Sequence, residues 1–315
     1  MSTTAVAASP QQVEQIFNTK PRGLWSHAMH RLIHRRSAII GMIMLGGLLF
    51  IAIFAPVLST HDPVQSLIGI EKGIKKREAP CIHALGCPAE KSEHFFGTDG
   101  NVRDLYSRVL YGARLSLFVG IVAVGFAIVI GALLGSFAAY VGGWTDSIVM
   151  GLMDILLAFP GLILAIAIVT VLGPGLLNTL LAISIVSIPV YARIMRASVL
   201  AIKQQDYVLA GHSIGSGSRR IMFQNILPNA LTPLIVQGTL GIATAILDAA
   251  ALSFLGLGAQ PPTPEWGSMI GQERNQVFTA PQLIIFPGIA LLVTVLGFNL
   301  LGDGLRDALD PRQRS

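Results

Sequence analysis

Charged side chains are scarce in this sequence. Of its 315 residues only 12% are Asp, Glu, Lys or Arg, 52% are hydrophobic, and the mean hydropathy is +0.65. A soluble domain carries roughly 25% charged residues. The few charges are gathered into short segments, and the uncharged runs between them reach or exceed the ~20 residues that a helix needs to cross hydrocarbon. These absences exclude an ordinary water-soluble fold and predict an all-α polytopic membrane protein.

Sequence signals of nucleotide binding and of catalysis are also missing. No Gly-x-x-x-x-Gly-Lys-Ser/Thr phosphate loop is present, and the Gly-Ser-Gly-Ser segment at 215–218 lacks both the lysine and the preceding strand. Ser184, Ser187 and Ser253 lie in apolar runs without a His or Lys that could act as a base. The formal charge of +5 comes with no basic groove or aromatic stacking motif, so nucleic acid is not an expected partner. We expect a non-catalytic chain that holds no cofactor and no metal.

The distribution of positive charge predicts the topology of the first third. Residues 1–36 are polar and strongly basic, so we expect a cytoplasmic N-terminal segment. The uncharged run 37–58 follows as the first span, an uncleaved anchor and not a secretory signal. Residues 59–112 are hydrophilic, and their lysines and arginines only match their acids in number, which is typical of an extracytoplasmic loop.

A core of five further spans is expected at 113–302. Its apolar runs are 115–145, 155–192, 221–247 and 275–302. The second run is too long for one helix, so we expect the Gly-Pro-Gly turn at 173–175 to divide it. The Pro-rich stretch 261–274 carries little positive charge and is placed outside, whereas the tail 303–315 is placed in the cytoplasm. The prediction is six transmembrane helices with both termini inside.

A second basic segment supports this alternation. It covers 193–228, between the predicted fourth and fifth spans, and therefore falls on the same side as the N-terminus. A five-span topology would place the two basic segments on opposite sides. The link at 142–146 has no Lys or Arg and is assigned to the cytoplasm by parity alone.

The cytoplasmic segment contains a candidate docking element for another protein. Residues 205–220 predict a short helix, a glycine turn and a second helix. Asp206 lies near the start of the first helix, where the helix dipole favours a carboxylate. The small residues Ala210, Gly211 and Gly215 leave a surface that a partner can approach closely.

Here the sequence resembles a known family. The docking element resembles the EAA motif, by which permeases of ABC importers engage their ATPases. Further strings resemble the dipeptide/oligopeptide/nickel permease family, most closely its dipeptide-type C subunit. They are Gly-Thr-Asp at 97–99 with Arg103, Asp104, Ser107 and Arg108; Gly-Ala-Arg-Leu-Ser-Leu at 112–117; Leu-Ser-Phe-Leu-Gly-Leu-Gly at 252–258; Pro261, Pro262, Trp266 and Gly267; and Asn-Leu-Leu-Gly-Asp-Gly-Leu-Arg-Asp at 299–307.

The resemblance implies a fold, a function and partners. The fold is that of a type I ABC importer permease, and the function is to form half of a path for dipeptides or oligopeptides, with nickel or glutathione as alternative cargo. The partners are a homologous permease, two cytoplasmic ATPases that bind ATP and Mg²⁺, and an extracytoplasmic solute-binding protein. The residues expected to couple to the ATPases are Asp206, Tyr207, Ala210, Gly211, Gly215, Arg219 and Arg220.

The docking element departs from the family pattern at three positions. Leu209 stands in place of an acid, Gly211 in place of an alanine and Asn225 in place of an apolar residue. Charge-based contacts with the ATPases therefore do not follow from the resemblance.

Two acids in apolar surroundings are candidates for the translocation path. A carboxylate costs a few kcal/mol at the centre of a bilayer, so Asp154 and Asp248 are each expected to face a partner or a water-filled path. For Asp154 a position near the cytoplasmic headgroups is the alternative. For Asp248 the alternative is a structural hydrogen bond to a neighbouring helix.

Cysteine, histidine and glycine patterns each allow two interpretations. Cys81 and Cys87 lie in the predicted outer loop, where a disulfide is favoured over a metal site or free thiols. The histidines at 27, 30 and 34 recur at helical spacing, which favours an interfacial helix over metal binding. The small residues Gly131 and Gly135 favour close packing within the chain over a dimer contact.

A different functional class, an ion-coupled secondary carrier, would need broken helices and clusters of polar residues within the membrane. Two isolated acids do not form such a cluster.

Overall fold

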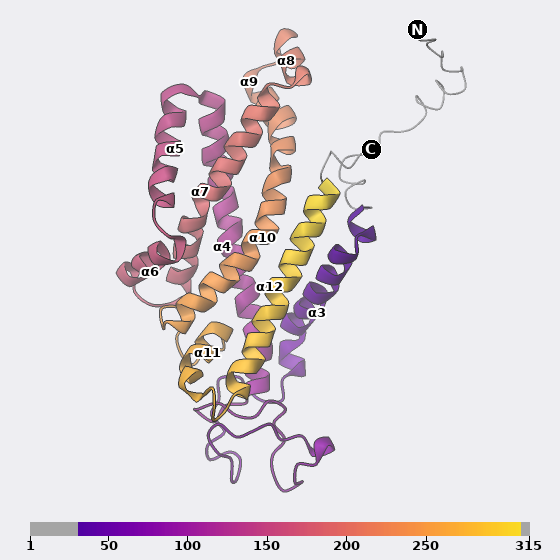
Figure 1. The fold of residues 1–315 in the computed structure, drawn as a ribbon, viewed down its shortest axis with the longest axis vertical. Helices are drawn as coiled ribbons and strands as arrows, with labels where there is room; N and C mark the ends of the chain where they lie inside the picture. Colours follow the sequence, from indigo (N-terminus) through magenta and orange to yellow (C-terminus); the bar gives the residue numbers. More distant parts are fainter. Residues whose placement is uncertain (1–30, 310–315) are drawn as a thin grey trace, which may run out of the picture.

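The computed structural model describes residues 31–309, and in these residues helices are the dominant element (Figure 1). Five helical segments are long and apolar enough to cross a membrane: α3 (Arg36–Leu58), α4 (Leu105–Val141), α7 (Leu176–Lys203), the continuous segment Ser218–Phe254, and α12 (Gln282–Leu309). Within the described residues β-structure is limited to isolated bridges. The predicted all-α membrane fold is confirmed.

A bent pair of helices follows α4 and adds a sixth crossing if the pair is counted as one span. Helix α5 (Gly143–Leu157) and helix α6 (Gly161–Leu172) meet at an angle of 90°. Pro160 lies at the break, where its ring and missing N–H prevent a continuous helix. The pair takes the chain from the end where α4 finishes to the end where α7 begins (Figure 1), so the count is six if the pair is one span.

The Gly-Pro-Gly turn at 173–175 separates α6 from α7 as predicted. The break at Pro160 was not predicted, because the residues around it are as apolar as the rest of the run.

Helices α4 and α7 extend beyond the apolar runs and include charged residues that have partners. Helix α4 begins at Leu105, ahead of the predicted core boundary at 113, and its Arg108 is only 1% exposed. The Arg108 Nη1 atom donates to the carbonyl oxygens of Pro63, at 2.7 Å, and Pro262, at 3.1 Å. Asp99 lies 3.4 Å from its Nε.

Helix α7 likewise includes two arginines that the sequence places in the cytoplasmic loop. Arg193 forms an ion pair with Asp154 at 2.5 Å, and Arg196 forms one with Asp146 at 2.5 Å. Both acids belong to α5, so the two pairs join α5 to α7. The non-helical part of the predicted loop is therefore short, since α7 ends at Lys203 and the next helix begins at Asp206.

Helices α4 and α7 pack with their backbones in close contact. A Cβ atom at Gly135 would lie 2.2 Å from the carbonyl oxygen of Ala192, and one at Gly131 would lie 2.7 Å from the Cβ of Tyr191. Ala192 and Tyr191 are buried in the larger apolar core. The predicted close packing within the chain is confirmed.

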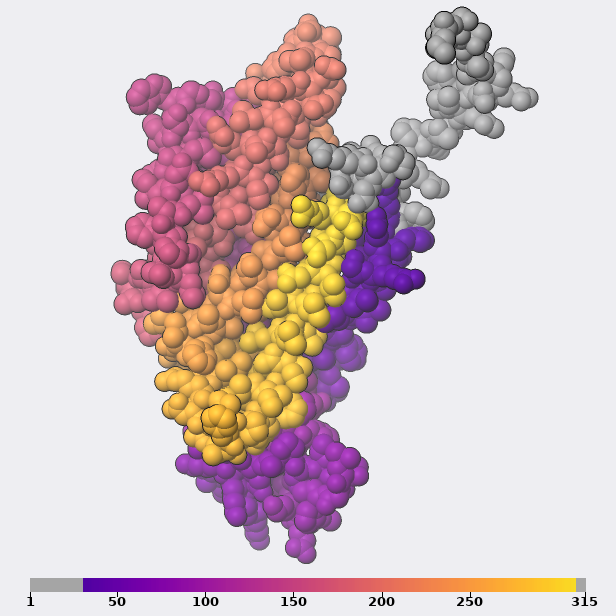
Figure 2. All heavy atoms as spheres, in the orientation of Figure 1, coloured from indigo at the N-terminus to yellow at the C-terminus, as the bar shows by residue number. Residues whose placement is uncertain are grey.

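The end of the molecule opposite α8 (Asp206–Ser213) is covered by the loop that joins α3 to α4 and by α11 (Trp266–Glu273), as Figure 2 shows for the loop. The short 3₁₀ helix η1 (His83–Leu85) lies in this loop, and η3 (Arg274–Gln276) follows α11. Helix α11 lies within the stretch predicted as a simple outer connection. Trp266 explains its position, because the side chain is buried and its Nε1 donates to the Val109 carbonyl oxygen at 3.0 Å.

The substitution Gly135→Val should destabilise the isolated chain by about 1 to 3 kcal/mol, because added bulk in a close-packed interior forces the backbone apart. Thermal unfolding of the detergent-purified chain measures the effect. Gly125→Val is the matched control, since Gly125 lies in the same helix with nothing within 4 Å of its Cβ position. Equal melting midpoints for the two variants would contradict the close α4–α7 contact.

Candidate functional site

Helix α8 lies at one end of the molecule, far from the outer loop (Figure 1). It begins at Asp206, directly after Gln205, and ends before a turn at Gly215 with φ +78°. Helix α9 (Ser218–Arg220) then continues through the π-helical turn η2 (Ile221–Ile226) into α10 (Leu227–Phe254). The predicted order of a short helix, a glycine turn and a second helix is what the structure contains.

One face of α8 is attached to η2 and the start of α10. Val208 is fully buried in the same apolar cluster as Ile221 and Ile226. The hydroxyl of Tyr207 donates to the Asn225 carbonyl oxygen at 3.4 Å and accepts from Asn229 Nδ2 at 3.2 Å. These contacts connect α8 directly to the helix that continues into α10.

The opposite face of α8 and the turn after it are exposed and partly apolar. Leu209 is 52% exposed and Ile214 is 82% exposed. No described residue covers this face, and exposed apolar residues grouped at one place are typical of a contact with another protein. The α8 surface, as used below, consists of Asp206, Tyr207, Leu209, Ala210 and Ile214.

The remaining residues predicted for coupling have different surroundings. Gly211 is half-buried, and a Cβ there would lie 3.8 Å from Ile221 Cγ1. Arg219 and Arg220 are exposed on α9, and Arg220 Nε donates to Gln224 Oε1 at 3.0 Å. Ile214 was not predicted; its only signal in the sequence is an apolar residue beside a turn glycine in a polar segment.

The two candidate acids differ in their contacts. Asp154 is 60% exposed and already paired with Arg193. Asp248 is half-buried in α10 and makes no hydrogen bond or ion pair with any residue between 31 and 309. Of these two acids, Asp248 is the one whose carboxylate has no partner among residues 31–309.

Asp248 belongs to a polar stripe on α10. Gln237, Thr244 and Asp248 follow at helical spacing, so they share one face of the helix. Thr244 is exposed and the other two are half-buried. Toward the α8 end this face opens on a groove of about 440 Å³, whose polar lining includes Thr232, Gln237 and Arg306.

At the other end, the Gly-Thr-Asp segment organises a charged network. Asp99 accepts from Arg103 Nε at 2.7 Å and from the Arg103 backbone N–H at 2.9 Å. Glu273, at the end of α11, accepts from Arg77 Nε at 2.8 Å and from the Gly100 N–H at 2.9 Å. This network holds the outer loop against α4 and α11.

A capping carboxylate fixes the start of α11. Glu265 accepts from the backbone N–H groups of Gly267 and Ser268 at 2.9 and 2.8 Å. Burial raises the pKa of Glu265 above its usual range, although these two hydrogen bonds act against the rise.

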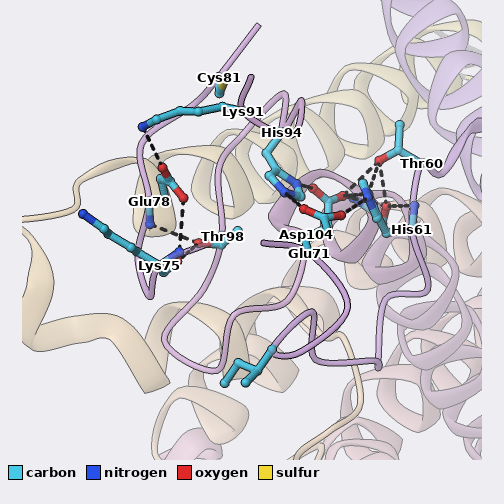
Figure 3. A network of polar contacts seen from close by, with 12 residues as sticks. Thr60, His61, Glu71, Lys75, Glu78, Cys81, Lys91, His94, Thr98 and Asp104 are labelled. Carbon is cyan, nitrogen blue, oxygen red and sulfur yellow. Dashed lines mark hydrogen bonds and ion pairs between the residues drawn. The ribbon is translucent and has the colours of Figure 1, made fainter. Parts of the chain in front are cut away.

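A second polar network lies between the outer loop and the start of α4 (Figure 3). His94 Nδ1 lies 2.9 Å from Asp104 Oδ1, and His94 Nε2 lies 3.1 Å from Glu71 Oε2. His61 Nε2 lies 3.0 Å from the other oxygen of Glu71. Burial disfavours the charged imidazole, but the hydrogen bonds to Asp104 and Glu71 outweigh it and raise the pKa of His94.

A disulfide joins Cys81 and Cys87, with their Cα atoms 5.4 Å apart. The backbone of Cys81 pairs with that of His94 through two hydrogen bonds of 2.9 Å. The disulfide therefore lies next to the segment that carries His94.

Of the three histidines in the predicted interfacial helix, those at 27 and 30 lie outside the described residues.

Family models match most of the chain. Residues 127–315 match the model described as binding-protein-dependent transport system inner membrane component. Residues 23–75 match the model described as the N-terminal TM domain of oligopeptide transport permease C.

Curated relatives are similar over 70 to 98% of the chain. The chain is 44% identical over 307 residues to a dipeptide transport system permease protein of Alkalihalophilus pseudofirmus, covering 98% of this chain and 95% of the relative. It is 44% identical to a di/tripeptide transport system permease protein of Pseudomonas aeruginosa, covering 90% of each. It is 50% identical over 220 residues to a glutathione transport system permease protein of Escherichia coli O6:K15:H31, covering 70% of this chain and 73% of the relative.

Among solved structures, the chain resembles an inward-facing structure of the MetNI methionine ABC transporter. The TM-score is 0.53 at 19% identity, and the match covers 64% of this chain and 96% of that one. At this identity the likeness concerns the fold alone.

The turn after α8 depends on its glycine. Gly215→Val should destabilise the turn conformation by about 1 to 2 kcal/mol, because a side chain disfavours positive φ. Hydrogen exchange of the amides at 206–216 should then be about tenfold faster. Gly217→Val is the matched control, since Gly217 has φ −63° and, like Gly215, nothing within 4 Å of its Cβ position. Equal exchange in both variants would show that the turn conformation does not hold α8.

Proposed function

Since the chain belongs to the family of binding-protein-dependent transport system inner membrane components, we propose that it is one permease subunit of an ATP-driven importer for short peptides. Its fold is that of the type I ABC importer permeases. The names of the relatives that cover most of the chain favour dipeptides as cargo.

The α8 surface is the observation that supports coupling to ATPases. It presents exposed apolar residues on a short helix whose other face is attached to η2 and α10. A partner that binds this surface and moves would displace α10 with it. The chain has no phosphate loop, so ATP and Mg²⁺ are held by the partner ATPases.

The arrangement of charges supports an orientation with both termini inside. Helix α3 begins and α12 ends toward the end that carries α8 (Figure 1). The basic residues of α7 and α9 lie at this same end, which suits the cytoplasm. The loop with the Cys81–Cys87 disulfide lies at the other end, which suits an oxidising compartment outside the cell membrane and an extracytoplasmic binding protein as partner.

The polar stripe on α10 supports a role in the translocation path. Asp248 has no partner within the described chain, and a half-buried carboxylate in a span is expected to face water or another polar group. We assign this face to the path and expect a homologous permease to supply the opposite wall. Asp154, which has Arg193 as its partner, needs no path to satisfy its charge.

Glutathione is the second candidate cargo, because a glutathione transport permease is 50% identical to the chain over 220 residues.

Ile214→Asp should abolish retention of the ATPases and lower ATP-driven uptake of a radiolabelled dipeptide at least tenfold, because it places a charge in the exposed apolar contact. The assay uses proteoliposomes that hold this chain with its second permease, ATPases and binding protein. Leu85→Asp is the matched control for ATPase retention, since Leu85 is also 82% exposed but lies in the outer loop.

If the Ile214→Asp assembly retains its ATPases and transports normally, the α8 surface is not the coupling contact. If the native chain takes up dipeptide from an ion gradient without ATP, the importer proposal is wrong. In the ATP-driven assay, competition with unlabelled dipeptide, glutathione and nickel chelates identifies the cargo.

Asp248→Asn should lower uptake about five- to tenfold while the ATPases stay bound, because the change removes a charge from the path. Two further variants test which face of α10 lines the path. Thr244→Val alters the polar stripe, whereas Thr239→Val alters the opposite face of α10. Both hydroxyls donate to carbonyl oxygens of their own helix at 2.9 Å, so the two variants differ mainly in the face they alter. Unchanged uptake by Asp248→Asn would exclude this face from the path.

A further inference from the structure

The outer network of Figure 3 contains a set of metal-ligating atoms that the transport function does not require. One ligand atom each from His61, Glu71 and His94 lie within 4.8 Å of one another. Both histidines direct the same ring atom, Nε2, at the Glu71 carboxylate, one toward each oxygen, at 3.0 and 3.1 Å. Three ligands of the kinds that borderline metal ions prefer therefore lie close enough together to surround one ion.

The other ring nitrogen of each histidine, Nδ1, lies within hydrogen-bond distance of another side chain. His94 Nδ1 lies 2.9 Å from Asp104 Oδ1, and His61 Nδ1 lies 2.9 Å from Thr60 Oγ1. Thr60 Oγ1 in turn donates to Asp104 Oδ2 at 3.3 Å. Metal-binding histidines almost always use their second nitrogen in this way, on a carboxylate or another polar group, which fixes the ring and leaves Nε2 for the ion.

Asp104 is itself fixed, because its Oδ2 accepts from the Ser107 backbone N–H at 2.8 Å and from the Ser107 hydroxyl at 2.7 Å. It also caps the N-terminus of α4. The supporting group behind His94 is thus part of the helix start and not a mobile side chain.

We propose that His61, Glu71 and His94 bind a single divalent transition-metal ion, best matched by Zn²⁺, with water in the fourth position. Two imidazoles and a carboxylate form a ligand set known for zinc, with bonds of about 2.0 to 2.2 Å. Tetrahedral ligands at such bonds lie roughly 3.3 Å apart, close to the present separations between Nε2 and the Glu71 oxygens. His94 is buried, whereas His61 and Glu71 are partly exposed, so an ion can reach the ligands from solvent.

The ion would cross-link segments that are distant in the sequence. His61 follows the end of α3, Glu71 and His94 lie in the outer loop, and Asp104 starts α4. The Cys81–Cys87 disulfide stands beside His94 through the paired backbones of Cys81 and His94. Metal binding would therefore fix the shape of the outer loop, and it goes beyond the proposed transport function.

Calorimetric titration of Zn²⁺ into the metal-free, detergent-purified full chain tests the proposal. We expect one tight site that Mg²⁺ does not occupy, since Mg²⁺ prefers oxygen ligands. His61→Ala should weaken binding at least tenfold and Glu71→Gln should abolish it. His83→Ala is the matched control, because His83 is an exposed histidine of the same loop that lies outside the cluster, with its Nε2 2.8 Å from the Lys91 carbonyl oxygen.

A second measurement guards against variants that fail to fold. Hydrogen exchange at 61–104 should slow on Zn²⁺ addition in the native chain and in His83→Ala but not in His61→Ala, whose metal-free melting midpoint should match the native one. Absence of Zn²⁺ binding to the native chain, undiminished binding to His61→Ala, or equal loss in His83→Ala would each overturn the proposal. None of these results depends on peptide transport.

Discussion

Helices α4 and α7 approach so closely at Gly131 and Gly135 that a methyl group would meet the backbone of the facing helix. Much of the molecule is positioned by this contact. Helix α4 starts in the outer network, where Asp104 caps it, and α7 ends just before α8. This closely packed pair therefore connects the outer network, at the start of α4, with the α8 surface, which follows the end of α7. Close packing of small residues can hold such a pair in a bilayer, where lipid is as apolar as the helices themselves.

Charged residues lie within these helices where other parts of the chain supply polar partners. Arg108 is buried because two carbonyl oxygens and Asp99 surround its guanidinium group, and Arg193 and Arg196 lie in α7 because acids of α5 face them. A hydropathy profile treats each charge as an interruption and so ends the spans too early. Most of these partners lie dozens of residues away in the sequence, so no local pattern reveals them.

The sequence was informative where a feature is local. The all-α membrane fold, the turn at 173–175 and the order of a short helix, Gly215 and a second helix all follow from residues close together in the chain. The contacts of Glu273 with Arg77 and Gly100 could not be predicted, because they join segments far apart in the sequence. The pairing of His61 and His94 on Glu71 could not be predicted for the same reason. The exposure of Ile214 could not be predicted either, because it depends on how the rest of the chain folds around that side chain.

Helix α10 connects the two ends of the proposed mechanism. At one end its start is bound to α8 through Tyr207 and Asn229, next to the π-helical turn η2. Further along it carries the polar stripe with Asp248, and its far end leads to α11, which Glu273 ties to the outer loop. A displacement of α8 would also move η2, because Val208 of α8 is buried against residues of η2. It must shift α10 as a body or bend it, and η2 is the place where bending is easiest, since a π-helical turn already departs from regular helix geometry. Along the chain from η2, the Asp248 face comes before α11 and its Glu273 contacts, so in the proposed mechanism a displacement of α10 would affect both the face assigned to the path and the outer network.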